Sequence, residues 1–365
     1  MSARILHRLP SRSSFPFLAA ARSNAWHSAI QRTVALVIVV VLIMPVSLAA
    51  AQEAASIAGP FSLTMEDDGI TVNYQGKLFT RYLKKSGNSP ALWPVIGPTG
   101  KEMTRGYPFR EGTASERTDH VHHRSIWFNH GDVNGVSFWE ESGRHGNVMH
   151  QEFVSHSGGA EAKIVTRNNW VDAEGAKICA DVRHVTFSAN DVVRMIDFDI
   201  TVINDTEKDV TFGDTKEGCF GVRVPGTMKV DAKLGGKIVN NAGDEDGAAW
   251  GREASWVDYH GPVENETLGI AVLNHPTSFR FPTYWHVRTY GLFAANPFGL
   301  KNFQNNKDAD GSHTIKPGES FTLDYRIVLH RGDESQANIA QAFVDYAKTD
   351  RSATVATNRE SGDAN

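Results

Sequence analysis

Cysteine is scarce in this chain of 365 residues, which contains only Cys179 and Cys219. The two residues do not form a C-x-x-C motif, so the sequence offers no zinc site of the cysteine type. The thiols can pair in an oxidising compartment or stay buried as thiols, because a chain of this length needs no disulfide to stabilise its core. The cysteines therefore indicate no function.

Basic residues are also scarce, except at the amino terminus. Residues 1–51 contain five arginines and no acidic residue, which leaves 32 basic against 42 acidic residues, a net charge of −10, in residues 52–365. Proteins bind nucleic acids largely by neutralising phosphates with lysine and arginine. A body this acidic excludes a nucleic-acid partner, and the mean hydropathy of −0.33 excludes a polytopic membrane protein.

One long apolar run is present, Val34–Val46, which follows the five arginines and precedes the small residues Ala49–Ala51. A basic segment, an apolar segment and an A-x-A site are the parts of a secretory signal. We expect residues 1–51 to be a signal peptide cleaved before Gln52, and the protein to be periplasmic or secreted without stable membrane insertion. The alternative is an uncleaved amino-terminal helix as anchor, since the run approaches the roughly 17 residues that span a bilayer.

Helical periodicity is rare beyond residue 60. Apolar residues alternate with polar ones in the segments 61–65, 70–74, 164–170, 182–187, 193–202, 268–272 and 321–329. Such alternation is typical of antiparallel sheets with one solvated face. One helical pattern runs from Glu334 to about Lys348, with Asp333 as its cap. We predict an all-β fold: a single large antiparallel β-sandwich over residues 55–350 with a C-terminal helix, and a disordered tail over residues 351–365.

Histidines concentrate in one stretch. Six of the thirteen histidines beyond residue 51 fall within residues 120–150, where an even spread would place about one. If the stretch is extended, His120 and His122 share one face and His123 points to the other. Joined by His130 or Asp132, they form a candidate site for a divalent transition metal such as zinc, iron or manganese.

The same imidazoles can work without a metal. With a neighbouring carboxylate such as Asp119, they offer hydrogen bonds and acid–base groups to a polyhydroxylated ligand. A plainer alternative is that these are polar turn residues that hold the loop of residues 131–135.

A second cluster lies in residues 284–299. Alternation places Tyr284, His286, Arg288 and Tyr290 on one face, which would make a wall for a sugar or, alternatively, a solvated sheet face. A third stretch places Glu217, Cys219, Gly221 and Arg223 on one face, where Glu217 and Arg223 form either an acid–base pair or a salt bridge.

These segments resemble the exported bacterial "methane oxygenase PmoA-like" family of unknown function. The resemblance covers most of residues 60–332, and it is carried by His120-x-His-His-Arg-Ser-x-Trp127, His130–Gly135, Trp250–Arg252, Trp256–Gly261 and Tyr284–Gly299. It implies an architecture similar to the galactose-mutarotase-like supersandwiches, which bind sugars in a concave cleft with histidines and carboxylates.

We therefore expect an exported supersandwich that binds or acts on a carbohydrate or sugar-derived ligand in a concave cleft. An enzyme of epimerase, lyase or hydrolase type would use His122 or His286 as proton donor and Glu217 or Asp119 as base. The expected ligand-binding residues are Arg124, His130, Asn134, Arg223, Tyr284, Arg288, Tyr290 and Asn296. Residues 119–135 and 284–296 should converge on one pocket, on the inner face of the sandwich.

Two other function classes stay open. One is a carbohydrate-binding module without catalytic activity. The other is a metal-dependent oxygenase or hydrolase whose ligands are His120, His122 and His130.

Overall fold

The structure is a computed structural model that describes residues 59–351, and these residues belong to one compact unit. The predicted signal peptide and, beyond residue 351, the predicted tail lie outside the described residues. Within residues 59–351, no helix is long and apolar enough to cross a membrane.

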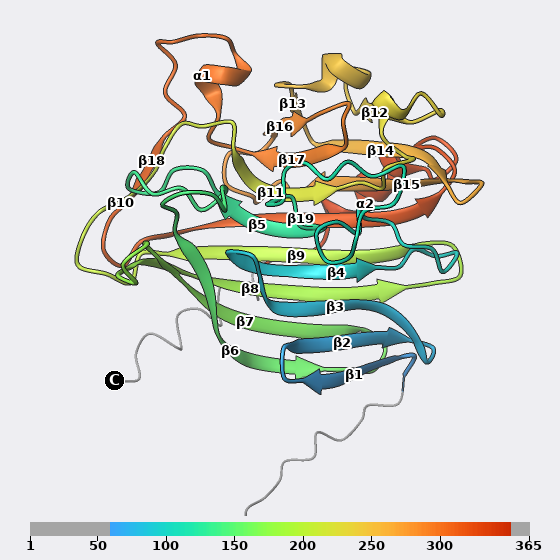
Figure 1. Ribbon diagram of the computed structural model, residues 1–365, viewed down its shortest axis with the longest axis horizontal. Coiled ribbons are helices and arrows are strands. Elements are labelled where there is room, and N and C mark those ends of the chain that lie inside the picture. Colours follow the sequence, from blue (N-terminus) through green and yellow to red (C-terminus); the bar gives the residue numbers. More distant parts are fainter. Residues whose placement is uncertain (1–58, 352–365) are drawn as a thin grey trace, which may run out of the picture. The chain divides into compact units, whose positions relative to one another are not determined.

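Two large sheets make up this unit (Figure 1), and all their strand pairs are antiparallel. The nine-stranded sheet has the order β1 (Phe61–Glu66), β2 (Gly69–Tyr74), β3 (Lys77–Ser86), β4 (Ser89–Val95), β5 (Ile126–His130), β11 (Gly218–Arg223), β17 (Leu292–Asn296), β16 (Thr283–Val287) and β13 (Glu253–Ala254). The eight-stranded sheet has the order β12 (Lys237–Asn240), β14 (Trp256–Val263), β15 (Glu266–Asn274), β19 (Ser320–Arg331), β9 (Arg194–Ile203), β8 (Lys177–Ala189), β7 (Ala162–Val171) and β6 (Asn147–Ser157).

The remaining elements are short: the strand pair β10 (Val210–Phe212) and β18 (His313–Ile315), the 3-10 turns η1 (Val230–Ala232) and η2 (Asp246–Ala249), and the helices α1 (Leu300–Phe303) and α2 (Ile339–Tyr346). The alternating segments of the sequence fall in strands, except that Val193 lies one residue before β9. The predicted all-β fold, an antiparallel β-sandwich with a C-terminal helix, is confirmed.

The inner faces of the two sheets meet in one aromatic and aliphatic core. Phe79 of β3 contacts Phe187 of β8 with ring centroids 5.6 Å apart, and Phe220 of β11 stacks on Tyr325 of β19 at 4.9 Å. Burial of each phenylalanine contributes roughly 1.5–3 kcal/mol, so such pairs hold the sheets together. Both cysteines are buried free thiols.

The edge strand β6 is irregular. Its register with β7 shifts twice, between His150 and Glu152 and again between Phe153 and Ser155. At its start, where it is still paired with β7, the N–H of Val148 donates to the carbonyl of Asn88, in the turn between β3 and β4, at 2.7 Å.

The helix α2 begins later than predicted. The Asp333 carboxylate does accept the Gln336 N–H at 2.8 Å, but it caps an irregular turn. Asn338 has φ of 54°, in the left-handed region, which ends that turn and delays the helix to Ile339. Ile339 and Tyr346 then pack on the outer face of the eight-stranded sheet.

Candidate functional site

The candidate site lies on the outer face of the nine-stranded sheet. A row of paired residues crosses four strands there: Trp127 of β5, Gly221 of β11, Ala294 of β17 and His286 of β16. Residues paired across a sheet point to the same side, so Trp127 and His286 share this face. Because the inner face is filled by the core, the expected location there is wrong.

A small hydrophobic cluster forms the floor of this face. It contains Ala91, Trp127, Trp139, Leu292 and Ala294, and it is separate from the core between the sheets. A Cβ on Gly221 would lie 2.5 Å from the Trp127 ring, so only glycine lets this ring lie across β11.

The histidine segment is a loop rather than a strand, so the predicted facing of its side chains is wrong. His120 has φ of 45°, which breaks the alternation. Its ring stacks on that of His123 at 4.8 Å, and the His122 ring stands at 90° to the latter at 4.6 Å. The buried Arg105 holds the loop, because it donates to the carbonyls of His120 at 2.8 Å and His123 at 3.1 Å.

The two motif segments meet through aromatic contacts. The ring of His120 lies 5.7 Å from that of His122 and stacks on Tyr290 at 5.3 Å. The Arg288 guanidinium lies 5.7 Å from both the Tyr290 and the Trp250 rings, and Trp250 lies 6.5 Å from the His286 ring. The two segments therefore converge on one face. Together with the four paired residues, these rings and the Arg288 guanidinium form one continuous row.

The arginines and the burial around this row keep His122 and His286 neutral. Burial, together with the charges of His120 and Arg105, lowers the pKa of His122 to about 4. Burial also lowers the pKa of His286 to about 4, although Glu217 acts in the opposite direction. At neutral pH neither residue is an imidazolium that can donate a proton, in contrast to the expected donor role.

Two carboxylates beside these histidines have pKa values shifted in opposite directions. Burial and the nearby charge of Glu217 raise the pKa of Glu140, whose Oε2 lies 3.2 Å from His122 Nδ1. Burial acts to raise the pKa of Glu217 too, but hydrogen bonds from Lys216 and Thr215 hold it below its usual value. The two carboxylates thus differ in proton affinity, which is higher at Glu140 than at Glu217.

Asp119, the other predicted base, is engaged by cations. Its Oδ1 lies 3.3 Å from guanidinium nitrogens of both Arg105 and Arg223. Although burial opposes it, the charges of Arg223 and His120 lower the pKa of Asp119. It positions the histidine loop.

His130 does not belong to this face, so the predicted metal set of His120, His122 and His130 is not brought together. Its ring points into the core, 4.9 Å from Phe298. Successive residues of β5 point to opposite faces, so His130, three positions after the outward-pointing Trp127, points inward. Nε2 lies 2.9 Å from the Gly213 carbonyl and Nδ1 3.3 Å from Cys219 Sγ, so both ring nitrogens are occupied. For the same reason, the prediction that His130 binds the ligand on this face is wrong.

Two predicted ligand-binding arginines are already paired. Arg124 forms a two-pronged ion pair with Glu141 at 2.5 and 2.6 Å. Arg223 is 2% exposed and donates to His123 Nδ1 at 2.9 Å. Both support the loop rather than a ligand.

Three further predicted residues hold the structure around the site. Asn134 lies in an exposed turn and accepts the Thr211 N–H at 2.7 Å, away from the row. The buried Asn296 donates to the Thr215 carbonyl at 2.9 Å and so holds the turn that carries Glu217. Tyr284 stacks on Phe303 of α1 at 5.6 Å, at the margin of the site.

The sequence prediction missed several residues of this face. Trp250 lies inside a motif segment and Glu140 inside the histidine-rich stretch of residues 120–150, so a signal for them existed. Asn129 gave none: it is 1% exposed, alternates with His130 on β5, and within residues 59–351 its amide has no hydrogen-bond partner. A buried amide of this kind is expected to be satisfied by a ligand or a water.

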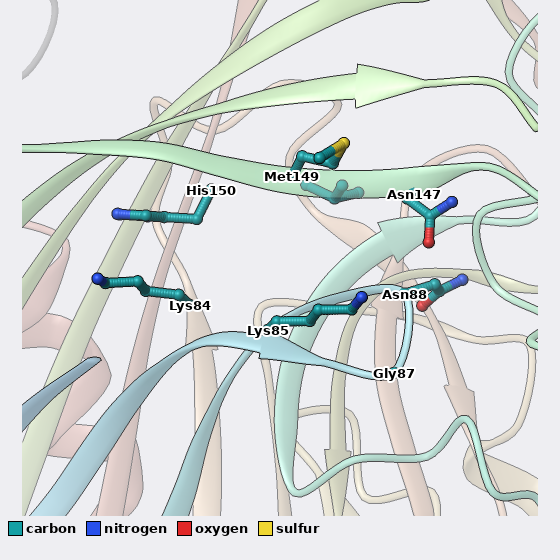
Figure 2. A pocket seen from close by; sticks show the side chains of 8 residues that line it. Lys84, Lys85, Gly87, Asn88, Asn147, Met149 and His150 are labelled. Atoms are coloured by element: carbon teal, nitrogen blue, oxygen red, sulfur yellow. The ribbon is translucent and has the colours of Figure 1, made fainter. Parts of the chain in front are cut away.

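A cavity of about 310 Å³ lies at another place, between β6 and the end of β3 with the turn that follows it (Figure 2). Lys84 of β3 and His150 of β6 point toward the same end of this gap, and Asn88 and Asn147 lie toward its other end. None of the predicted site residues lines this cavity.

Residues 69–344 match DUF6807, described as a family of unknown function. The chain belongs to this family. Every residue of the row lies inside the matched region. Among curated proteins, nothing matches the chain.

Several solved structures are similar to this DUF6807 chain. A GH36 alpha-galactosidase of Geobacillus stearothermophilus, solved in complex with raffinose, has 12% identity and a TM-score of 0.31, over 76% of this chain and 40% of that one. A galactose mutarotase related enzyme from Lactobacillus acidophilus has 11% identity and a TM-score of 0.35, over 75% and 98%. A galactose mutarotase-like protein from Lactobacillus casei has 12% identity and a TM-score of 0.33, over 74% and 100%. The DUF6807 chain spans about 40% of the length of the alpha-galactosidases.

Proposed function

We propose that this chain binds a carbohydrate or sugar-derived ligand at the row on the outer face of the nine-stranded sheet and acts on it by acid–base chemistry. The observation that carries the proposal is that the two motif segments meet, with His120 stacked on Tyr290 at 5.3 Å, and bring carboxylates beside histidines: Glu140 Oε2 lies 3.2 Å from His122 Nδ1. The pKa of Glu140 is raised and that of Glu217 is lowered. Opposite shifts in one site are how proteins separate an acid from a base. Glu140 is the proton donor and Glu217 the base.

The aromatic and cationic groups of the row suit a polyhydroxylated ligand. The Arg288 guanidinium lies against two rings, and within residues 59–351 it makes no hydrogen bond or ion pair. Its donors are free for hydroxyl or carboxylate oxygens, and the rings of Tyr290 and Trp250 offer faces to a sugar. His122 and His286, being neutral, donate and accept hydrogen bonds without adding charge.

The proposal includes export, with residues 1–51 removed. Sequencing the amino terminus of the exported protein should give Gln52 as the first residue. Residues before Val34 still attached would favour the anchored form. The resemblance to the "PmoA-like" family stays a prediction from the motif segments, and the proposed chemistry does not depend on it.

The test is a screen of neutral, acidic and oxidised sugars that measures binding by calorimetry and turnover by NMR. Glu140→Gln and Glu217→Gln should each lower turnover roughly 10²- to 10⁴-fold, with a smaller effect on ligand affinity. Glu207→Gln, the same change at an exposed position outside the row, is the control. Binding by the wild type without turnover would identify a carbohydrate-binding module, and unchanged turnover in both variants would refute the acid–base assignment.

A further inference from the structure

A second cluster of histidines and carboxylates lies on the other sheet, on its outer face. In β14, Val257 and Tyr259 belong to the core, so Asp258 and His260 point outward. Glu334 follows β19 in the segment that leads to α2. The function proposed above uses none of these residues.

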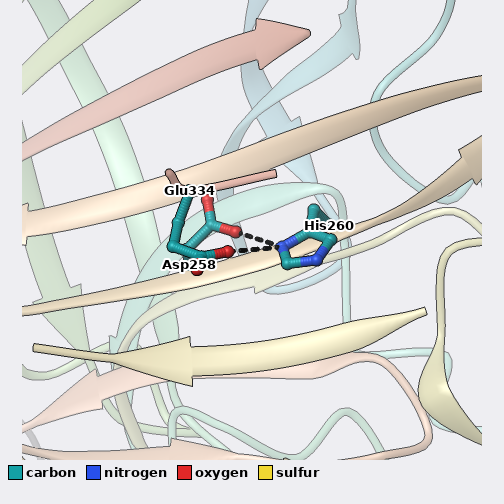
Figure 3. A group of neighbouring side chains, drawn as sticks. All are labelled: Asp258, His260 and Glu334. Atoms are coloured by element: carbon teal, nitrogen blue, oxygen red, sulfur yellow. Dashed lines mark hydrogen bonds and ion pairs between the residues drawn. The ribbon is translucent and has the colours of Figure 1, made fainter. Parts of the chain in front are cut away.

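Three potential ligand atoms meet at this point (Figure 3). His260 Nδ1 lies 2.7 Å from Asp258 Oδ1 and 3.5 Å from Glu334 Oε2. In residues 59–351, this is the group of histidine and acidic side chains whose ligand atoms all lie within 4.8 Å of one another. Bonds of 2.0–2.2 Å to a tetrahedral zinc ion place ligand atoms about 3.3–3.6 Å apart. The pair His260–Glu334 already has this separation.

A second histidine orients the carboxylate of Asp258. His330 Nε2 lies 2.6 Å from Asp258 Oδ2, so the two oxygens of this buried carboxylate face two different histidines. Histidine–carboxylate contacts behind a ligand are a recurrent feature of metal sites, because they fix the ligand's direction.

The sheet is built to allow this contact. Gly269 of β15 lies between His260 and His330, paired with both. A Cβ at Gly269 would lie 2.2 Å from the His330 ring, so the ring crosses β15 to reach Asp258 only because position 269 is glycine.

The cluster is close enough to the surface for an ion to reach it. The Asp258 side chain is fully buried, whereas those of His260 and Glu334 are 9% and 23% exposed. Three protein ligands with solvent on one side leave the fourth position of a tetrahedral ion to water.

We propose that Asp258, His260 and Glu334 bind one divalent first-row metal ion, with Zn²⁺ preferred over Mn²⁺ according to the usual order of affinities. The ion takes the place of the hydrogen bond between His260 Nδ1 and Asp258 Oδ1. It connects β14 to the segment between β19 and α2, and thereby fixes the beginning of that segment on the sheet.

The experiment is a calorimetric titration of the EDTA-treated, dialysed protein with ZnCl₂, together with thermal unfolding with and without zinc. We expect one ion per chain and a higher Tm with zinc, since a ligand that binds only the folded state stabilises it. Glu334→Gln, which keeps the shape of a partly exposed side chain, should weaken zinc binding at least tenfold. His330→Gln should weaken zinc binding roughly 10- to 100-fold, because His330 does not contact the ion but orients the Asp258 carboxylate that does.

Two histidine variants serve as controls. His156→Ala removes an exposed histidine of β6 and should leave zinc binding unchanged. His120→Ala removes a histidine of the rival cluster on the other sheet and should also leave it unchanged. Loss of zinc binding in His120→Ala, equal binding by wild type and Glu334→Gln, or no binding by the wild type would each overturn the proposal. Because the Glu334 side chain is 23% exposed, Glu334→Gln is expected to fold, and the test does not rest on a variant of the buried Asp258.

Discussion

The two outer faces of the sandwich carry the same kinds of residue in opposite electrostatic settings. On the nine-stranded sheet, His122 is surrounded by positive groups, and with burial these lower its pKa to about 4. On the eight-stranded sheet, His260 lies between Asp258 and Glu334, whose charges raise its pKa although burial acts to lower it. The pKa of the first histidine is therefore lowered, whereas that of the second is raised.

The difference shows that the neighbours of a histidine, rather than its presence in a cluster, indicate its task. On the first face Glu140 lies beside the neutral His122, and Glu217 is held by Lys216 and Thr215. Under the proposed function both acids act on the ligand. On the second face each carboxylate oxygen of Asp258 is matched by an imidazole nitrogen. That arrangement is the one proposed above to bind a metal ion.

The largest expected effect is on the free energy of unfolding, and it distinguishes Asp258, a structural acid, from Glu217, the proposed base. Asp258→Asn removes the shared charge between two buried histidines and should lower the free energy of unfolding by about 3–5 kcal/mol, the range for breaking a buried pair. Glu217→Gln should change it by less than about 1 kcal/mol, because its main partner, Lys216, is partly exposed. Urea unfolding in the presence of EDTA measures both. Equal losses of unfolding free energy in the two variants would contradict the assignment of a structural role to Asp258 alone.

The second prediction concerns pH. His286 has an ordinary pKa of 6.5 when unfolded and about 4 when folded, so below pH 6.5 the unfolded state binds the extra proton first. Its contribution is fully present above pH 6.5 and is lost as the pH falls toward 4, by about 3 kcal/mol at most. His286→Gln, which can still donate to the Lys216 carbonyl, should remove this loss. Urea unfolding of the wild type and His286→Gln between pH 4 and 7 checks this prediction. If both lose the same stability as the pH falls, His286 is not neutral in the folded state.

The third prediction compares the two glycines that make room for rings. Gly221→Ala places a methyl group against Trp127 and should cost about 1–3 kcal/mol of stability, as overpacking usually does. It should also weaken the sugar binding, since Trp127 is part of the floor. Gly269→Ala should cost a similar amount but leave the sugar binding unchanged. Thermal unfolding and the ligand screen measure the two effects.

The smallest effect on stability is expected at Arg288. Arg288→Lys keeps the charge but loses the planar donors and much of the contact with Trp250 and Tyr290, so stability should change by less than about 0.5 kcal/mol. Ligand affinity should fall clearly, most for acidic sugars. An equal loss of affinity for neutral and acidic sugars would assign Arg288 to hydroxyl groups.

The strands of the fold were predictable from local pattern, whereas the boundaries of irregular segments were not. The alternation in residues 164–170 lies within β7, which buries every second residue along most of its length. The start of α2 could not be predicted, because Asn338 interrupts a continuous helical pattern by taking a left-handed conformation.

The site was predictable in its segments but less so in its side chains. That residues 119–135 and 284–296 meet followed from their unusual content of polar and aromatic groups. The positive φ of His120 and the inward direction of His130 depend on the loop and on the start of β5, which the sequence pattern did not locate. The Asp258 cluster depends on three strands and a glycine between them, and no local pattern joins residues 258 and 334.

The two bulges of β6 bear on how copies of this protein behave when they meet. A long regular edge strand with exposed Met149 and Val154 would be a template for pairing with another molecule. The register shifts after His150 and after Phe153 twist the strand away from a straight edge, and the bond between Val148 and Asn88 covers one end. The irregularity of β6 therefore protects the sandwich from edge-to-edge aggregation.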